Sequence, residues 1–294
     1  MSYIFKEHTE GDYSIGPQIE MLDDLKDLNI ENKKVLSIGA YGGYPLFFLA
    51  QGGVEVIALD SSPHRIRANR FLRGLLRNGT FEDNVEALWL EINQEPSQFG
   101  TYFNESTQRL FENCHLYGSG LPESEAQESY EEFRNWRSNL VFLRRQLMDF
   151  PPHKEDLSVY YPHLGDKETF EKVKEKVIQS RYRIIEDDLL NFLEVRGEKF
   201  DLIYGSSVRH WVLNFGFLDV GKTSDDFQKQ FDRRLGEAVR QRLNMGGIFV
   251  DVLIGTESYK LVPVENQLYW DGKTQRKKSI AHEETRVELT YTQF

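Results

Sequence analysis

Two short apolar runs in the first quarter of the chain constrain its fold more than any other feature. Residues 35–38 run into a glycine-rich loop at 39–43, and residues 54–60 end on an aspartate, Asp60. Such runs, bounded by turn residues, predict β-strands, and the apolar periodicity that follows each of them predicts a helix. The pair Ser62-Pro63 favours a helix start, because serine caps free amides and proline suits the first helical position. This order of elements predicts the first half of a doubly wound α/β sheet.

The same alternation resumes after a long gap. Apolar runs followed by helical periodicity recur, and two segments near the carboxyl terminus alternate apolar and polar residues, as antiparallel strands do. The predicted strands are 182–185, 200–204, 248–254, 258–264 and 285–292; the predicted helices are 45–51, 63–78, 189–193 and 231–243, the last closed by the turn residues Asn244–Gly247. The chain is therefore predicted to be an α/β protein.

Residues 81–178 differ in composition from the rest of the chain. They are rich in Glu, Arg, Tyr, Phe and Trp, and helical spacing is visible in parts of the segment. We predict an α/β core, residues 1–80 and 179–294, interrupted after its second strand by a largely helical insertion, residues 81–178. Open α/β sheets bind ligands beyond the carboxyl ends of their strands. We therefore expect the insertion to form the acceptor side of a ligand site, or a lid over it.

Composition excludes several classes of protein. The chain has 294 residues, 36 Lys and Arg against 47 Asp and Glu, a net charge of −11 at pH 7, and one cysteine, Cys114. A single cysteine excludes an intramolecular disulfide and a cysteine-based zinc or iron–sulfur site. The seven histidines lack the spacing of zinc ligands, so we expect no metal. The excess of acids argues against a broad basic face for nucleic acid, although a local basic patch is compatible with it.

No apolar run reaches the roughly 20 residues that span a bilayer, and the amino terminus lacks the apolar centre of a signal peptide. We therefore expect a cytoplasmic protein with no integral membrane segment and no nucleic-acid partner. The sequence leaves the oligomeric state open.

The glycine loop and Asp60 have the arrangement of a nucleotide site. Glycine permits positive φ and lets a ligand approach the backbone closely. Asp60 lies 21 residues after Gly39, where nucleotide-binding α/β folds place an acid that accepts hydrogen bonds from the ribose hydroxyls. The alternative interpretation is a tight turn followed by a solvated aspartate at the end of a strand.

The spacing of the loop favours S-adenosylmethionine over NAD. The glycines read Gly-x-x-Gly-Gly rather than the Gly-x-Gly-x-x-Gly that holds a pyrophosphate, and Tyr41 and Tyr44 leave little room for one. Either tyrosine could pack against a sulfonium, whose charge a π face stabilises, or be an ordinary core or surface aromatic. The predicted cofactor-binding residues of this region are Gly39, Ala40, Tyr41, Gly43, Asp60 and Ser61.

Polar residues also follow the next two predicted strands. Asp187 and Asp188 come after strand 182–185, where they could bind the amino group of adenine or cap the helix that begins at Leu189. Ser206 follows strand 200–204 and could face the reacting centre. These three residues complete the predicted cofactor-binding set.

The core resembles the class I S-adenosylmethionine-dependent methyltransferase fold, a Rossmann-like, mostly parallel seven-stranded sheet with a late antiparallel strand pair. More narrowly, it is similar to the S-adenosylmethionine:diacylglycerol 3-amino-3-carboxypropyl transferases, which make the homoserine ether of betaine lipids. The matching stretches are Val35–Gly39 with Gly43, Val56–Asp60 with Pro63, Tyr117–Gly120, Asp188–Leu193 and Phe200–Ser207. The resemblance implies S-adenosylmethionine as the cofactor and transfer of its aminocarboxypropyl group to a small-molecule or lipid nucleophile.

Two alternative functions stay open. The sulfonium carries three carbons, and an in-line nucleophile attacks whichever of them the pocket presents. The chain could therefore be a methyltransferase acting on a small molecule. It could also be a non-catalytic protein that binds S-adenosylmethionine.

Two residues are candidates for the catalytic groups. His210 lies four residues after Ser206, and its imidazole has the intrinsic pKa of a general base. The alternative is a histidine at a helix start with no chemical role. Tyr161, in a cluster with Tyr160 and His163, could close over the acceptor or form a packed turn between domains.

Overall fold

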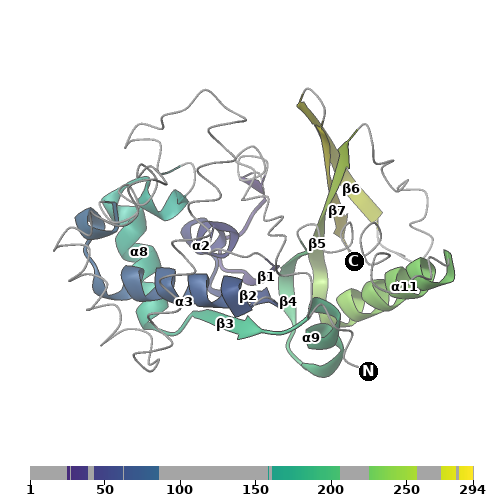
Figure 1. Cartoon of the computed structure of the whole chain (residues 1–294), viewed down its shortest axis with the longest axis horizontal. Coiled ribbons are helices and arrows are strands. Elements are labelled where there is room, and N and C mark those ends of the chain that lie inside the picture. The colour runs from purple at the N-terminus through teal and green to yellow at the C-terminus, as the bar shows by residue number, and fades with distance from the viewer. Residues whose placement is uncertain are drawn as a thin grey trace. The chain divides into compact units, whose positions relative to one another are not determined.

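The computed structural model describes residues 25–26, 28–38, 43–61, 63–85, 158, 161–205, 225–256, 273–282 and 285–293 (Figure 1). The chain consists of two compact units, one made of Met1–Glu31 and Gly39–Glu186 and the other of Asn32–Ile38 and Asp187–Phe294. The strands of the described residues belong to a seven-stranded sheet with the order β3-β2-β1-β4-β5-β7-β6.

The first unit contains two parallel strands with helices packed against them. Its strands are β2 (Glu55–Asp60) and β3 (Tyr182–Glu186), and its helices are α2 (Gly43–Ala50), α3 (Pro63–Asn78), the 3₁₀ turn η4 (Pro162–Leu164) and α8 (Lys167–Ile178). β2 and β3 pair in register from Val56 opposite Tyr182 to Asp60 opposite Glu186. Residues 56–59 are at most 2% exposed. β2 is therefore buried on both faces, as strands of parallel sheets covered by helices are.

The helix α3 is amphipathic, and its apolar side faces the interior. Ile66, Leu72, Leu75 and Leu76 are at most 2% exposed, and the spacing of the three leucines places them on one side of the helix. A buried hydrogen bond joins α3 to β3, because the hydroxyl of Tyr182 donates to Oδ1 of Asn69 over 2.9 Å. This bond holds the helix in one register against the strand.

Two lysines of α8 contact the carboxyl-terminal ends of the neighbouring helices. The ammonium of Lys176 donates to the carbonyl of Leu49 in the last turn of α2 over 3.0 Å. That of Lys174 donates to the carbonyl of Gly79, just past α3, over 2.6 Å. A cation at this position offsets the negative end of the helix dipole. α8 thereby holds α2 and α3 together.

The second unit contains the remaining strands. Its strands are β1 (Lys34–Ile38), β4 (Phe200–Tyr204), β5 (Leu243–Thr256), β6 (Lys273–His282) and β7 (Thr285–Gln293), and its helices are α9 (Leu189–Val195) and α11 (Asp225–Arg242). β1, β4 and β5 are parallel. β7 is antiparallel to both β5 and β6. The predicted fold class is therefore confirmed: an α/β, Rossmann-like sheet that is mostly parallel and ends in an antiparallel strand pair.

The predicted junction between the last helix and its strand was wrong. α11 ends at Arg242 and β5 begins at the next residue, so Asn244–Gly247 belong to the strand rather than to a helix cap. The register of β4 against β5 shifts between Phe200 and Leu202, and such an irregularity accommodates extra residues in one strand. Gly246 has a φ of 76°, which lies in the left-handed region that glycine adopts readily. Because both β-bulges and helix ends use this conformation, a glycine here is compatible with either structure.

Of the strand β6, the sequence predicts only a solvated strand start at Arg276–Lys278. Its pairing with β7 includes Arg276, Lys277 and Lys278, whose charges conceal the alternation of a strand. The strand lies at the edge of the sheet order, where lysines and arginines are common because they discourage pairing with another chain. The predicted strand 258–264 lies outside the described residues.

The predicted insertion, residues 81–178, is described only at its two ends. α8 falls within this range and packs against α2 and α3. The domain boundaries stay a prediction. No helix in the described part of the chain is both long and apolar enough to cross a bilayer.

Gly205 follows β4 at a place where a larger residue does not fit. Its backbone N–H donates to the carbonyl of Val250 over 2.8 Å. A Cβ atom at Gly205 would lie 2.7 Å and 2.9 Å from two ring carbons of Phe249. Phe249 is 2% exposed, so its ring has little room to move. The absence of a side chain at Gly205 therefore lets β4 end tightly against β5.

We expect Gly205→Ala to lower the free energy of unfolding by about 1–3 kcal/mol, because the added methyl overpacks the contact with Phe249. Gly197→Ala is the matched control, since nothing lies within 4 Å of a Cβ atom built there. That control should leave stability unchanged or raise it slightly. Urea denaturation of both variants measures the difference, and equal stabilities would contradict the packing argument.

Candidate cofactor-binding site

Asp60 is a buried carboxylate at the end of a buried strand. It is the last residue of β2 and is 6% exposed, whereas the next residue, Ser61, is exposed. Burial of a carboxylate is costly unless the group accepts hydrogen bonds. A ribose diol offers two donors, so Asp60 fits the predicted role. The alternative of a solvated aspartate does not agree with this burial.

Gly43 is the first residue of α2, and the helix after it is buried. Every residue from Gly43 to Leu49 is buried, Tyr44 among them. A helix that is apolar all round belongs to the interior, which explains the run of aromatic and aliphatic residues here. The predicted cofactor-binding residues Gly39, Ala40 and Tyr41 lie outside the described residues.

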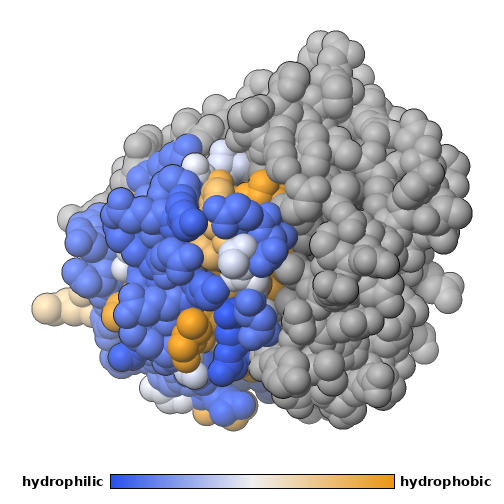
Figure 2. Space-filling view, turned by 90° about the vertical axis from the view of Figure 1, so that its left-hand side faces the viewer, coloured by the Kyte–Doolittle hydropathy of each residue, from blue (hydrophilic) through white to orange (hydrophobic). Residues whose placement is uncertain are grey.

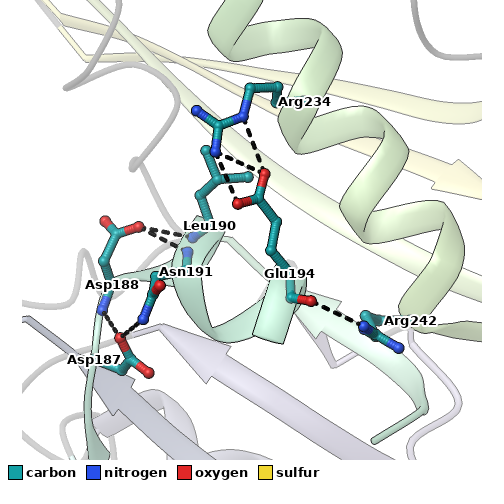
Figure 3. Close-up of polar contacts among 7 residues, drawn as sticks. All are labelled: Asp187, Asp188, Leu190, Asn191, Glu194, Arg234 and Arg242. Carbon is teal, nitrogen blue, oxygen red and sulfur yellow. Dashed lines mark hydrogen bonds and ion pairs between the residues drawn. The ribbon is translucent and has the colours of Figure 1, made fainter. Parts of the chain in front are cut away.

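Asp187 and Asp188 organise the start of α9 (Figure 3). Asp188 is the N-cap residue, and its Oδ1 accepts from the backbone N–H groups of Leu190 and Asn191 over 3.0 Å and 3.1 Å. Oδ1 of Asp187 accepts from the backbone N–H of Asp188 over 2.9 Å and from the side-chain amide of Asn191 over 2.7 Å. The predicted capping role is therefore confirmed for Asp188. Binding of adenine by either residue stays a prediction.

The other end of α9 is held by α11 (Figure 3). Arg234 makes a forked contact with Glu194, with Nε and Nη2 within 3.0 Å of the carboxylate oxygens. Arg242 donates to the backbone carbonyls of Leu193 over 2.6 Å and Glu194 over 3.2 Å. These carbonyls belong to the last turn of α9, which has no further helix to bond them. Both ends of the short helix are thus bonded, and the position of Asp188 is well defined.

Tyr161 and His163 form a buried aromatic pair around η4. Tyr161 is 3% exposed and His163 is 2% exposed. Their rings meet edge to face with centroids 5.9 Å apart. Burial lowers the pKa of His163 to about 3, so the imidazole is neutral at pH 7. Nδ1 of His163 is buried and has no hydrogen-bond partner within the part of the chain that the structure describes. The role of Tyr161 as a catalytic group stays a prediction.

Ser206 and His210 lie outside the described residues. The two residues before them, Tyr204 and Gly205, are buried at the end of β4. Among the residues that the structure describes, no group of three His, Cys, Asp or Glu side chains is arranged to hold a metal ion.

Several contacts around the candidate residues were not found by sequence reasoning. Asn191 lies four residues after Asp187, a helical spacing that could have indicated their contact. Arg234 is 40 positions from Glu194. No local pattern indicates a pair so far apart, because tertiary packing of α11 on α9 creates it.

No family model matches the chain, and no curated protein matches it. Among solved structures, the chain is similar to the N-methyltransferase NodS from Bradyrhizobium japonicum WM9 in complex with S-adenosyl-L-homocysteine, with 11% identity and a TM-score of 0.42 over 95% of this chain and 89% of that one. It is also similar to the rRNA methyltransferase aviRa from Streptomyces viridochromogenes, with 10% identity and a TM-score of 0.41 over 94% and 85% of the two chains. Similarity at this level assigns no activity or substrate to the chain.

We expect Asp188→Ala to lower the free energy of unfolding by about 1 kcal/mol, and Asp188→Asn to leave it nearly unchanged, because asparagine caps helices as well as aspartate does. Chemical denaturation of the two variants tests the cap. Asp166→Ala is a matched control, since Asp166 caps α8 in the same way. If Asp188 also binds adenine, both Asp188 variants should weaken S-adenosylmethionine binding while the control does not. Equal destabilisation by Ala and Asn would contradict the cap.

The buried His163 predicts a pH dependence of stability. Its pKa is about 3 in the folded chain and about 6.5 when unfolded. The unfolded chain therefore binds the extra proton as the pH falls below 6.5, and the free energy of unfolding falls with it. His163→Leu removes this contribution. Between pH 7.5 and pH 5.0 the wild type should lose about 2 kcal/mol more than the variant. If urea denaturation shows that the wild type and the variant lose the same free energy of unfolding, the pKa of His163 is not lowered by burial.

Proposed function

We propose that the chain is an S-adenosylmethionine-dependent transferase. The observation that carries this proposal is Asp60, a carboxylate that is 6% exposed at the carboxyl end of a parallel strand buried on both faces. It follows Gly39 by 21 residues and precedes a helix that begins at Pro63. The fold is compatible with this function but hosts many others, so the proposal rests on the residues.

Asp60 would accept hydrogen bonds from the two ribose hydroxyls of the cofactor. A buried carboxylate makes stronger hydrogen bonds than a solvated one, because its charge is less screened. In the same proposal, Gly39, Ala40, Tyr41 and Gly43 provide backbone close to the ligand. Ser61, Asp187, Asp188 and Ser206 complete the cofactor-binding set, with the two aspartates beside adenine.

We favour transfer of the 3-amino-3-carboxypropyl group to a small-molecule or lipid nucleophile. The support is the resemblance of Val56–Asp60, Asp188–Leu193 and Phe200–Ser207 to the transferases of betaine-lipid synthesis. The nucleophile attacks the aminocarboxypropyl carbon bound to sulfur, the carbon–sulfur bond breaks, and methylthioadenosine leaves. A hydroxyl nucleophile gives its proton to a base, for which we propose His210. Tyr161 is proposed to lie on the acceptor side.

Isothermal titration calorimetry with S-adenosylmethionine tests the cofactor proposal. We expect the wild type to bind and Asp60→Ala to lose roughly 1.5–3 kcal/mol of binding free energy, which corresponds to an affinity about 10- to 150-fold lower. Asp166→Ala, at the exposed cap of α8, is the control and should bind as the wild type does. Absence of binding by the wild type, or equal affinity of Asp60→Ala, would overturn the proposal.

The identity of the product tests which group is transferred. Methylthioadenosine, together with an acceptor that has gained the aminocarboxypropyl group, supports the favoured reaction. Formation of S-adenosylhomocysteine would instead show that the methyl group is transferred. Cofactor binding with neither product over a broad screen of acceptors would favour a non-catalytic binding protein.

A further inference from the structure

One side of α3 carries a row of arginines. Arg70, Arg73 and Arg77 are separated by three and then four residues, a spacing that places them on one face of the helix. Arg77 is exposed, and the other two are partly exposed. Within the described part of the chain, none of the three makes an ion pair, and α3 itself contains no acidic residue. We call these three residues the arginine face.

Some other arginines of the described residues are paired with carboxylates. Arg183 contacts Glu55, and Arg233 contacts Glu237, each at 3.0–3.1 Å. In a chain with a net charge of −11, carboxylates are abundant, so a row of arginines without them is unusual.

The cations of the arginine face also act on one another. Burial is the main cause that lowers the pKa of Arg73 below its ordinary value, and the charges of Arg70 and Arg77 lower it further, against an opposite effect of Tyr182. A charge that is partly buried beside like charges is destabilising unless an anion compensates it. An external anion would supply this compensation.

The surroundings keep the local charge positive. The carboxyl-terminal end of α3 would be negative by its helix dipole, but Lys174 donates to the carbonyl of Gly79 there. The acids that follow α3 in sequence are engaged: Glu82 pairs with Lys167 at 3.2 Å, and Asp83 accepts from the backbone N–H of Thr80 over 2.9 Å. These contacts leave the arginine face available to a partner.

The chemistry of the face indicates a polyphosphate rather than a protein or a bilayer. The apolar side chains of α3 whose burial the structure describes, such as Leu72 and Leu75, are buried, so these residues offer no apolar anchor for a protein interface or for insertion into lipid. On the side of this unit that bears α8, the described surface is mostly hydrophilic and its apolar patches are small and separate (Figure 2). Guanidinium groups bind phosphate oxygens through forked hydrogen bonds.

We propose that the arginine face of α3 binds the phosphate backbone of a nucleic acid. This departs from the expectation that the excess of acids excludes a nucleic-acid partner, because contact depends on the charges within reach of the phosphates and not on the sum over the chain. The inference does not rest on the transferase proposal.

Fluorescence anisotropy with a short labelled single-stranded RNA and a short labelled DNA duplex, over a series of salt concentrations, tests the proposal. We expect the full-length wild type to bind at low salt. The triple variant Arg70→Gln/Arg73→Gln/Arg77→Gln should bind at least about 10-fold more weakly, and its slope of log affinity against log salt should fall by roughly 2–3, since each phosphate contact contributes about 0.7–0.9. The corresponding triple Arg→Lys variant keeps the charge and should retain most of the binding.

The control variant Lys172→Gln/Arg233→Gln/Arg240→Gln changes the net charge by the same amount at exposed positions of α8 and α11. It should bind as the wild type does. Absence of wild-type binding at low salt, or equal losses in the two glutamine triples, would overturn the proposal. Binding to phosphatidylserine vesicles that depends on the arginine face, without binding to nucleic acid, would also overturn it, in favour of a membrane contact.

Calorimetry with S-adenosylmethionine on the same variants separates this inference from the proposed function. We expect the arginine variants to keep the cofactor affinity of the wild type, which also shows that they fold. A wild type that binds nucleic acid but no S-adenosylmethionine would overturn the transferase proposal and support this one. Binding of the cofactor without binding of nucleic acid would support the transferase proposal and overturn the proposal for the arginine face.

Discussion

Burial of β2 on both faces is the constraint on which the rest of the first unit depends. The strand has no polar side chain between Val56 and Leu59, so helices and a neighbouring strand must cover it. Helix α3 supplies its apolar side, and α8 joins α2 to α3 through two lysine–carbonyl bonds. Asp60 is the first position after this apolar run where a charge occurs. Its burial at that point makes it the strongest candidate for contact with a polar ligand.

In the second unit, the short helix α9 depends on contacts at both of its ends. An isolated helix of this length would be marginal in water, because nucleation is costly. Asp188 bonds the first amides, and Arg242 bonds the last carbonyls. The charge-assisted bonds of Arg242 to otherwise open carbonyls should stabilise α9 more than the forked contact of Arg234 with Glu194, which is exposed to solvent. Candidate ligand residues at the start of α9 therefore depend on side chains of α11.

Net charge and local charge lead to different expectations for this molecule. The chain as a whole is acidic, yet α3 presents arginines with no carboxylate of the described residues against them. Salt screens the interaction of exposed charges beyond about 10 Å at 0.1 M. Distant acids then contribute little to the electrostatic potential at the arginine face. The net charge of the whole sequence is therefore a poor guide to what one surface binds.

The sequence by itself determined the alternation of strands and helices, the parallel core, the helix start at Pro63 and the acid that ends β2. Each of these follows from apolar periodicity, capping or spacing within a few neighbouring residues. The local pattern did not distinguish a helix cap from a bulge at Asn244–Gly247, and charged side chains concealed most of β6 beyond the strand start at Arg276–Lys278. Only the tertiary structure decided that Asp60 is buried rather than solvated, that Arg234 meets Glu194, and that His163 is enclosed. The reason is physical: burial and contacts between distant residues depend on how the elements pack, and no short stretch of sequence contains that information.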